Sequence, residues 1–260
     1  MIRMVDYHMH TVLSDGKNSH EEMIQEAIAI GLDEIGFSDH VCLKPVDWSM
    51  RLEDIPVMTN QILELKLKYD DQIKIRYGIE MDYFPGRENE LKELIESIPV
   101  DYVIGSVHFI GDWNFDTDLS LYGKWTNDKL YEMYFGLIQQ AAQSGLFDVI
   151  GHLDLIKKFR VYPESNQDKL YEDTIQIIKD NNLVVELNTG GMDRPCSEFF
   201  PGEKLMELCY RHHVPITLSS DAHRSVQIAR YYESAIAQLS QIGFTEMVGF
   251  HNRIRQVVRL

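Results

Sequence analysis

The chain has 260 residues, of which 44% are hydrophobic and 25% are charged. This length is typical of one large α/β domain with a full core. The formal net charge is −16, from 41 acidic and 25 basic residues, so the surface repels nucleic acid and anionic lipid, and we expect neither as a partner. A small anionic substrate needs a place where bound cations locally reverse the sign of the charge.

The beginning of the sequence, MIRMVDYHMHT, contains acid and histidine and has no apolar core, unlike an export signal. No apolar run approaches the roughly 20 residues that span a bilayer, so we predict no membrane association. The three cysteines, Cys42, Cys196 and Cys209, form no Cys-x-x-Cys pair. This pattern fits a reducing compartment rather than a disulfide framework, and we predict a cytoplasmic location.

Segments with apolar residues at two-residue spacing alternate along the chain with longer amphipathic segments. Strands are predicted, in chain order, at residues 4–10, 34–40, 73–82, 101–108, 148–154, 183–188 and 216–221. Helices are predicted at residues 19–31, 52–69, 88–97, 127–144, 167–181, 202–212 and 225–241. A capping box of Ser19 and Glu22 begins the first helix. Such alternation requires a parallel sheet, which about seven units can close into a barrel or wind into a doubly covered sheet.

No repeat, low-complexity tract or linker divides the sequence, so residues 1–260 are predicted to form a single domain. The tail, residues 244–260, contains Val257-Val258 and several arginines. We predict that it adds a short closing strand and a helical turn.

The histidines are concentrated at one level of this predicted fold. Six of the ten lie at or just past the C-terminal end of a predicted strand: His8, His10, His40, His108, His152 and His223. Asp15, Glu80 and Asp221 lie at the same level. Strand residues at i and i+2 point to the same face, and all strands of a parallel barrel end at one face. Distant segments are therefore expected to converge on one pocket.

These residue types predict a metal centre. Imidazole and carboxylate are the ligands that zinc, manganese and iron prefer. A His-x-His pair suits one ion, and a glutamate on another strand can bridge two ions about 3.5–4 Å apart. One His-x-His motif has little specificity, but six histidines at one end of a sheet rarely arise by chance. The spacing alone leaves the role of Asp15 open, because aspartate is common in turns such as Ser14-Asp15-Gly16.

The motifs that carry these residues follow one another from about residue 6 to about residue 224. They are His8-Met9-His10-Thr11, Ser14-Asp15-Gly16, Phe37-Ser38-Asp39-His40, Gly78-Ile79-Glu80, Gly105-Ser106-Val107-His108, Gly151-His152 and Ser220-Asp221-Ala222-His223. In this order they resemble the polymerase and histidinol phosphatase (PHP) superfamily. The chain length, the insert after His108 and the stretch Asn188-Thr189-Gly190 are similar to the histidinol-phosphate phosphatases of histidine biosynthesis.

The resemblance implies a distorted (β/α)7 barrel with three divalent metal ions, of zinc, manganese or iron. The ligands that it implies are His8, His10, Glu80 and Asp221 for one metal, Glu80, His108 and His152 for a second, and Asp15, His40 and His223 for a third. Many members of the superfamily have histidine where this chain has Asp15. An aspartate there keeps an oxygen ligand available and favours harder ions.

The resemblance also implies a reaction, the hydrolysis of L-histidinol phosphate to L-histidinol and phosphate by attack of a metal-bridging hydroxide. Asp221 and His223 are catalytic candidates, because the leaving alkoxide needs a proton. Arg160 and Arg194 follow predicted strands and are candidates for binding the phosphate, since guanidinium suits bidentate contacts to its oxygens. Arg224 is a weaker candidate. Each of these arginines could equally pair with a surface acid.

The loop at residues 110–126 leaves two interpretations open. Its aromatic and acidic side chains are Trp113, Phe115, Tyr122, Asp112, Asp116 and Asp118. They could hold the cationic imidazole and amine of the substrate, or they could form an ordinary solvated loop with aromatic packing.

Two other functions remain as alternatives. One is another PHP-type phosphoesterase that acts on a nucleotide or another small phosphate ester, although the acidic surface argues against a long nucleic acid. The other is a non-catalytic metal-binding module, which would need only closed coordination and no arginines in the pocket.

Overall fold

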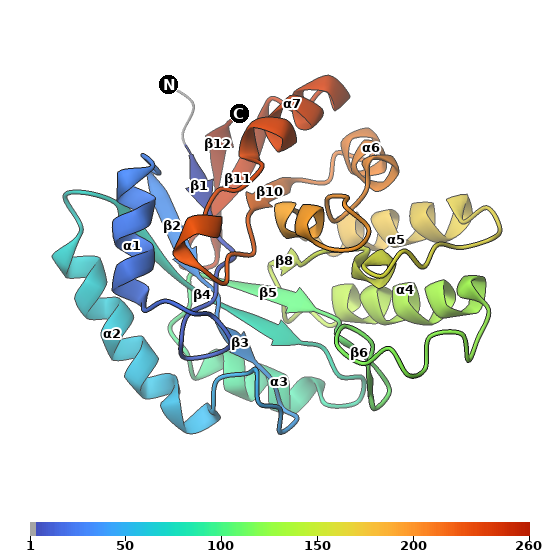
Figure 1. The fold of residues 1–260 in the computed structure, drawn as a ribbon, viewed down its shortest axis with the longest axis horizontal. Coiled ribbons are helices and arrows are strands. Elements are labelled where there is room, and N and C mark those ends of the chain that lie inside the picture. Colours follow the sequence, from blue (N-terminus) through green and yellow to red (C-terminus); the bar gives the residue numbers. More distant parts are fainter. Residues whose placement is uncertain (1–3) are drawn as a thin grey trace.

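The computed structural model describes residues 4–260. Parallel strands follow one another around a nearly closed barrel in the order β1-β2-β4-β5-β8-β9-β10 (Figure 1). Their bounds are Val5–Asp6, Glu34–Phe37, Lys74–Asp82, Tyr102–Ser106, Val149–Ile150, Val184–Asn188 and Ile216–Ser219. The short strand β3 (His40–Val41) also pairs with β4 and sets His40 opposite Glu80. The predicted α/β barrel is confirmed.

The barrel closes at the C-terminal ends of its first and last strands. Met9 and Ala222 form a parallel bridge there. The amide of His10 donates to the carbonyl oxygen of Ala222 at 2.8 Å, and the amide of Ala222 donates to the carbonyl oxygen of His8 at 3.2 Å. The closing contact of the barrel therefore lies directly beside two of the predicted metal ligands.

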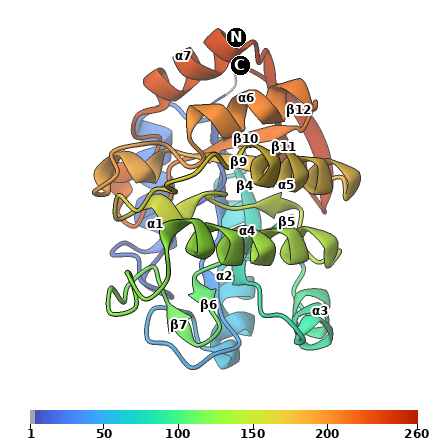
Figure 2. The same cartoon turned by 90° about the vertical axis from the view of Figure 1, so that its right-hand side faces the viewer.

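Helices cover the outside of the barrel (Figures 1 and 2). They are α1 (His20–Ala29), α2 (Ile55–Lys68), α3 (Glu88–Glu96), α4 (Asn127–Gln143), α5 (Asp168–Asp180), α6 (Glu203–Arg211) and α7 (Tyr232–Ile242). The 3₁₀ helices are η1 (Leu52–Asp54), η2 (Leu155–Lys157), η3 (Thr189–Asp193) and η4 (Ser225–Gln227). The predicted capping box is present, since Ser19 accepts from the amide of Glu22 and Glu22 accepts from the amide of Ser19. None of the helices in residues 4–260 is both long and apolar enough to cross a membrane.

Tyr102, on β5, is fully buried in the core of the barrel. Its hydroxyl donates to the carbonyl oxygen of Tyr7 at 2.6 Å. Its ring lies over Gly36 and Gly78 on two neighbouring strands, where a Cβ atom would come within 2.2 Å of the ring or its hydroxyl. The two glycines therefore make room for one large side chain across the barrel.

The tail differs from its prediction. The antiparallel strands β11 (Glu246–His251) and β12 (Ile254–Arg259) form a hairpin, so the predicted helical turn is wrong. Asn252 and Arg253 form the two-residue turn with φ of 50° and 62°, the left-handed conformation that such turns require. Asp101 accepts hydrogen bonds from both amides, at 2.9 Å on its side chain and 2.8 Å on its carbonyl oxygen. Asp101 lies about 150 residues before the turn, so no local sequence pattern predicts this contact.

Replacing Gly78 by alanine is expected to lower the free energy of unfolding by about 1–3 kcal/mol or more, because the new Cβ atom would overlap the ring of Tyr102. Gly136→Ala in α4 is the matched control, since no atom outside its own helix backbone lies within 4 Å of the added Cβ. This control should stabilise the protein by up to about 1 kcal/mol. Urea unfolding measures both changes, and equal losses would contradict the packing of Tyr102.

Candidate metal centre

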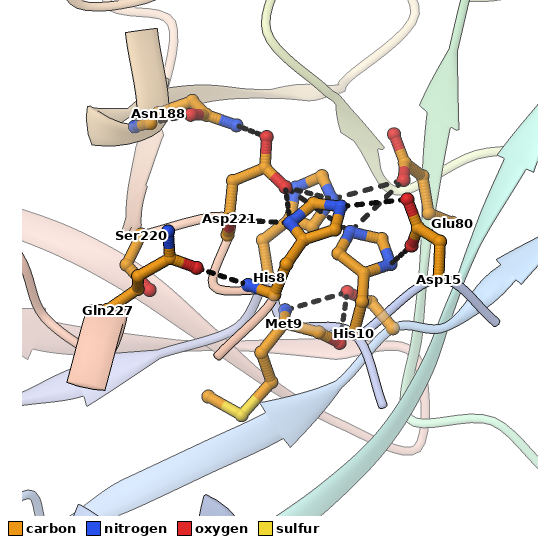
Figure 3. Close-up of polar contacts among 12 residues, drawn as sticks. His8, Met9, His10, Asp15, Glu80, Asn188, Ser220, Asp221 and Gln227 are labelled. Atoms are coloured by element: carbon orange, nitrogen blue, oxygen red, sulfur yellow. Dashed lines mark hydrogen bonds and ion pairs between the residues drawn. The ribbon is translucent and has the colours of Figure 1, made fainter. Parts of the chain in front are cut away.

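A cavity of about 570 Å³ opens at the C-terminal ends of the barrel strands. Seven of the predicted metal ligands line it: Asp15, His40, Glu80, His108, His152, Asp221 and His223. The other two, His8 and His10, follow β1 and have no exposed surface. Figure 3 shows His8, His10, Asp15, Glu80 and Asp221 pointing toward one another. The structure thus brings all nine predicted ligands to one place.

Glu80, on β4, is at the centre of the group and is 1% exposed. Its Oε2 atom lies 2.8 Å from Nδ1 of His40, 3.1 Å from Nε2 of His8 and 3.5 Å from Nε2 of His10. Its Oε1 atom lies 2.9 Å from Nε2 of His152. Burial alone would raise the pKa of Glu80, but the adjacent imidazoles of His40 and His8 reverse this effect and hold the pKa well below its usual value. Glu80 therefore presents an anionic carboxylate to several histidines at once.

A second group surrounds Asp15. Asp15, His10, His40 and His223 each offer one ligand atom, and these atoms all lie within 4.8 Å of one another. The turn that carries Asp15 is fixed by the buried carboxylate of Asp39, which accepts hydrogen bonds from the hydroxyl of Ser14 and from the amide and hydroxyl of Thr11. Asp15 is thus held at the cavity by its turn.

Asp221 joins the two groups from the end of β10. Its Oδ1 atom lies 3.3 Å from Nε2 of His10 and 3.8 Å from Nε2 of His8. Its backbone has φ of 53°, a strained conformation for a residue with a side chain. Arg230 stabilises this turn by donating to the carbonyl oxygens of Ser220 and Asp221, each at 3.0 Å. Arg230 was not predicted as a site residue. It lies nine residues after Asp221, in an interval predicted as helix.

Buried carboxylates orient the remaining histidines. Asp82 lies 3.0 Å from Nδ1 of His108. Glu186, on β9, lies 2.6 Å from Nδ1 of His8 and accepts a hydrogen bond of 2.6 Å from the amide of His152. Glu186 was also missed, because a lone acidic residue inside an apolar strand carries no recognisable motif. Glu186 lies two residues before Asn188 and therefore on the same face of the strand, and this spacing is the signal that could have identified it.

The unpartnered atoms of this site match a metal-binding donor set. Among the described residues, the buried atoms without a hydrogen-bond partner include Nε2 of His8, both ring nitrogens of His10, Oδ1 of Asp15, Nδ1 of His40 and Oε2 of Glu80. Buried polar atoms without partners are costly, so their concentration here calls for a ligand. Imidazole nitrogens and carboxylate oxygens suit zinc, manganese or iron. The residues present therefore fit bound divalent metals.

The cavity also carries cationic side chains, of which Lys158 and Arg230 are paired with Asp116 and Asp193. Its lining includes Lys17, Lys158, Arg194, Arg224 and Arg230. Arg194 and Arg224 thus lie where a phosphate could reach them. Arg160 is not part of the described lining, and its Nε atom donates to the carbonyl oxygen of Pro195. Its role in substrate binding stays a prediction.

Some side chains of the loop at residues 110–126 lie in the core, and others line the cavity. Trp113 and Phe115 are buried, and the ring of Trp113 packs edge-on against Tyr122 at 4.9 Å. Asp116 lines the cavity and forms a 2.6 Å ion pair with Lys158. The aromatic residues of this loop therefore pack in the protein, whereas Asp116 faces the site.

Comparison with known proteins agrees with the resemblance seen in the motifs. The family model described as PHP domain matches residues 6–190. A protein of Deinococcus radiodurans named probable histidinol-phosphatase is 30% identical over 262 residues, which cover 98% of this chain and 100% of that protein. The histidinol-phosphatase of Lactococcus lactis is 27% identical over 259 residues, covering 96% and 95% of the two chains.

A solved structure covers the same length. The histidinol phosphate phosphatase of Lactococcus lactis, complexed with zinc, L-histidinol and phosphate, superposes with a TM-score of 0.85 at 26% identity. The superposition covers 98% of this chain and 100% of that one.

Zinc or manganese is expected to raise the melting temperature of the metal-free protein by several degrees, because the metal binds only the folded site. Glu80→Gln should remove most of this rise, since it replaces the shared anionic ligand. Glu96→Gln, an exposed change in α3, is the control and should keep it. Thermal unfolding with and without metal measures the effect. A rise of wild-type size in Glu80→Gln would exclude Glu80 as a ligand.

Proposed function

Because the chain belongs to the PHP domain family, we propose that it is a histidinol-phosphatase, a phosphoric monoester hydrolase that converts L-histidinol phosphate to L-histidinol and phosphate in histidine biosynthesis. The observation that carries this proposal is the buried cluster of potential ligands around Glu80, in a cavity whose lining also includes Arg194 and Arg224. The Lactococcus enzyme, which shares this fold over its full length, was solved with zinc, L-histidinol and phosphate.

We further propose that three divalent metal ions bind, of zinc, manganese or iron. The proposed ligands are His8, His10, Glu80 and Asp221 for the first, Glu80, His108 and His152 for the second, and Asp15, His40 and His223 for the third. Three clusters of ligand atoms within 4.8 Å of one another support parts of this arrangement: His8, His10 and Glu80; His10, Asp15, His40 and His223; and His40, Glu80 and His108. Asp221 and His152 are assigned by their contacts with His10 and Glu80. When bound, such ions neutralise the charge that develops on the phosphate and activate water for attack on phosphorus.

The protein's own cations are proposed to position the phosphate. Arg194 directly follows η3 and lines the cavity, so its guanidinium can bind two phosphate oxygens at once. Arg230 has a different task, because its Nη1 atom already lies 2.6 Å from Asp193 and its other nitrogens hold the Asp221 turn. We keep Arg160 as a second candidate for phosphate binding.

Asp221 and His223 are proposed to move the proton that the leaving alkoxide needs. Nδ1 of His223 lies 3.0 Å from the carbonyl oxygen of Asp221, and its Nε2 atom lies 3.2 Å from Asp15. The side chains of His223 and Asp221 are 23% and 16% exposed and line the cavity, so they can reach a bound substrate.

The whole chain is proposed to act as one PHP-type barrel domain, residues 1–260. A continuous hydrophobic core that extends from Val5 to Val258 supports this proposal. A cytoplasmic location is supported by the free cysteines Cys42, Cys196 and Cys209, which are all buried.

Phosphate release from a substrate panel tests the proposed reaction. The panel contains L-histidinol phosphate, an aryl phosphate, a nucleotide and a short DNA. We expect selective release from L-histidinol phosphate by the zinc- or manganese-loaded protein, and loss of that release in Glu80→Ala. Preference for the nucleotide would identify another phosphoesterase instead, and near-normal turnover by Glu80→Ala would overturn the metal-dependent scheme.

Arg194→Ala is expected to raise the KM for L-histidinol phosphate roughly tenfold or more, because hydrogen bonds to a charged group are lost. The KM for a neutral ester should change less. Arg211→Ala, an exposed change in α6 away from the cavity lining, is the matched control and should leave this KM unchanged. Steady-state kinetics measures both variants. Equal effects of Arg194→Ala on the charged and the neutral ester would count against phosphate binding by this residue.

A further inference from the structure

Glu186 is a buried carboxylate on β9, a strand that supplies none of the nine predicted metal ligands. Its side chain has no exposed surface. It meets four hydrogen-bond donors: Nδ1 of His8 and the hydroxyl of Ser219 on Oε1, and the amide of His152 and Nδ2 of Asn188 on Oε2. Four donors satisfy the acceptor capacity of a carboxylate. Glu186 therefore has no remaining site for a metal and acts only on its neighbours.

Three of those neighbours lead to predicted ligands. The imidazole of His8 is bound directly at 2.6 Å, and the amide of His152 is bound at 2.6 Å. Nδ2 of Asn188 donates to Oε2 of Glu186 at 3.2 Å. It also donates to Oδ2 of Asp221 at 3.2 Å, a contact that Figure 3 shows. His152 has φ of 21°, a conformation that persists only when its surroundings hold it. A single carboxylate thus ties together ligands from β1, β8 and β10.

The contact with His8 also decides which ring nitrogen faces the cluster. An ionised carboxylate only accepts hydrogen bonds, so Nδ1 of His8 must carry the hydrogen in this contact. In the neutral ring, Nε2 then keeps its lone pair. Nε2 lies 3.1 Å from Oε2 of Glu80 and has no hydrogen-bond partner. Glu186 thereby selects the form of His8 that can bind a metal.

We propose that Glu186 is a positioning residue that sets the affinity of the metal centre by holding His8 in its ligating form. The proposal rests on the metal centre of the proposed function and does not depend on the identity of the substrate. Partners of this kind make metal-binding histidines more basic and fix the orientation of the ring.

Glu186→Gln tests this role because the neighbours restrict how an amide can fit. The amide of His152 is always a donor, and Asn188 keeps its own orientation because its Oδ1 atom accepts a 2.9 Å bond from the amide of Gly190. The glutamine oxygen must therefore face His152 and Asn188, and its NH₂ group must face His8. Metal binding through Nε2 of His8 requires a hydrogen on Nδ1. The Nδ1–H group would then face the NH₂ group of the glutamine, and two donors form no hydrogen bond.

The experiment measures zinc affinity without substrate, by competition with a fluorescent chelator. Glu186→Gln is expected to weaken zinc binding roughly 10- to 100-fold. Asp101→Asn is the matched control, because Asp101 is also a buried carboxylate that accepts hydrogen bonds from backbone amides, before β5 at the opposite end of the barrel. It should keep the wild-type zinc affinity even where it lowers thermal stability.

A second measurement separates positioning from general damage to the fold. In zinc-loaded protein labelled with ¹⁵N-histidine, His8 should show a slowly exchanging Nδ1–H signal that is absent from a His8→Gln protein. This signal should be lost in Glu186→Gln. It should remain in Glu186→Asp, which keeps a carboxylate, and zinc affinity there should lie between those of the wild type and Glu186→Gln.

Wild-type zinc affinity in Glu186→Gln would overturn the proposal. So would a loss of affinity that leaves the Nδ1–H signal unchanged, or equal affinities in Glu186→Asp and Glu186→Gln. If Glu186→Gln does not fold, the comparison of Glu186→Asp with the wild type decides, and unchanged affinity there overturns the proposal. A protein that binds zinc normally but releases no phosphate from L-histidinol phosphate would refute the proposed function and leave this inference intact.

Discussion

The placement of one buried carboxylate, Glu80, among converging imidazoles is the constraint on which the rest of this site depends. Its oxygens lie within 3.7 Å of nitrogens of five histidines: His8, His10, His40, His108 and His152. A buried charge needs partners of opposite sign, and buried nitrogens need partners of their own. Side chains alone leave several of these atoms unsatisfied, and divalent cations would satisfy all of them together. The parallel barrel makes this possible, because it brings residues from distant segments to one end.

Acidic and basic side chains surround this centre at increasing distance from Glu80. Buried carboxylates contact the predicted ligands from behind: Asp82 contacts the ring of His108, and Glu186 contacts the ring of His8. Arg230 lies farther out, where it ties Asp193 to the turn of Asp221. In a protein of net charge −16, bound cations and the basic cavity lining would then be the place where an anionic substrate is attracted. The same acidity elsewhere on the surface discourages long polyanions.

Rules of local spacing predicted the parallel strand–helix alternation and the convergence of histidines and acids on one pocket, whereas the choice of a barrel and the grouping of ligands came from the resemblance to the PHP superfamily. Strand periodicity located the seven parallel strands, although β1 and β8 end at Asp6 and Ile150, earlier than predicted. His8 and His10, which the i, i+2 rule paired, both follow β1. Residues that act through distant contacts were not predictable in this way. In the sequence, Glu186 is an isolated acidic residue in an apolar strand. Arg230 lies in the interval 225–241 that was predicted as a helix, but the helix begins only at Tyr232. The tail hairpin depends on Asp101, which lies about 150 residues before its turn.

Asp15 shows how tertiary packing resolves what spacing leaves open. Aspartate in a Ser-Asp-Gly turn has a sufficient backbone explanation. In the structure, however, the turn packs so closely on the first strand segment that a Cβ atom at Gly16 would lie 2.3 Å from the carbonyl oxygen of His10. This approach brings the short carboxylate within 3.2 Å of His223, with 32% of its side chain exposed. The outer part of the centre is therefore more open than the part around His8, which has no exposed surface. In the proposed ligand sets Asp15 is the single oxygen ligand beside two histidines in the outer site, whereas Glu80 and Asp221 accompany two histidines in the site of His8. The two parts of the centre therefore differ both in ligand composition and in exposure.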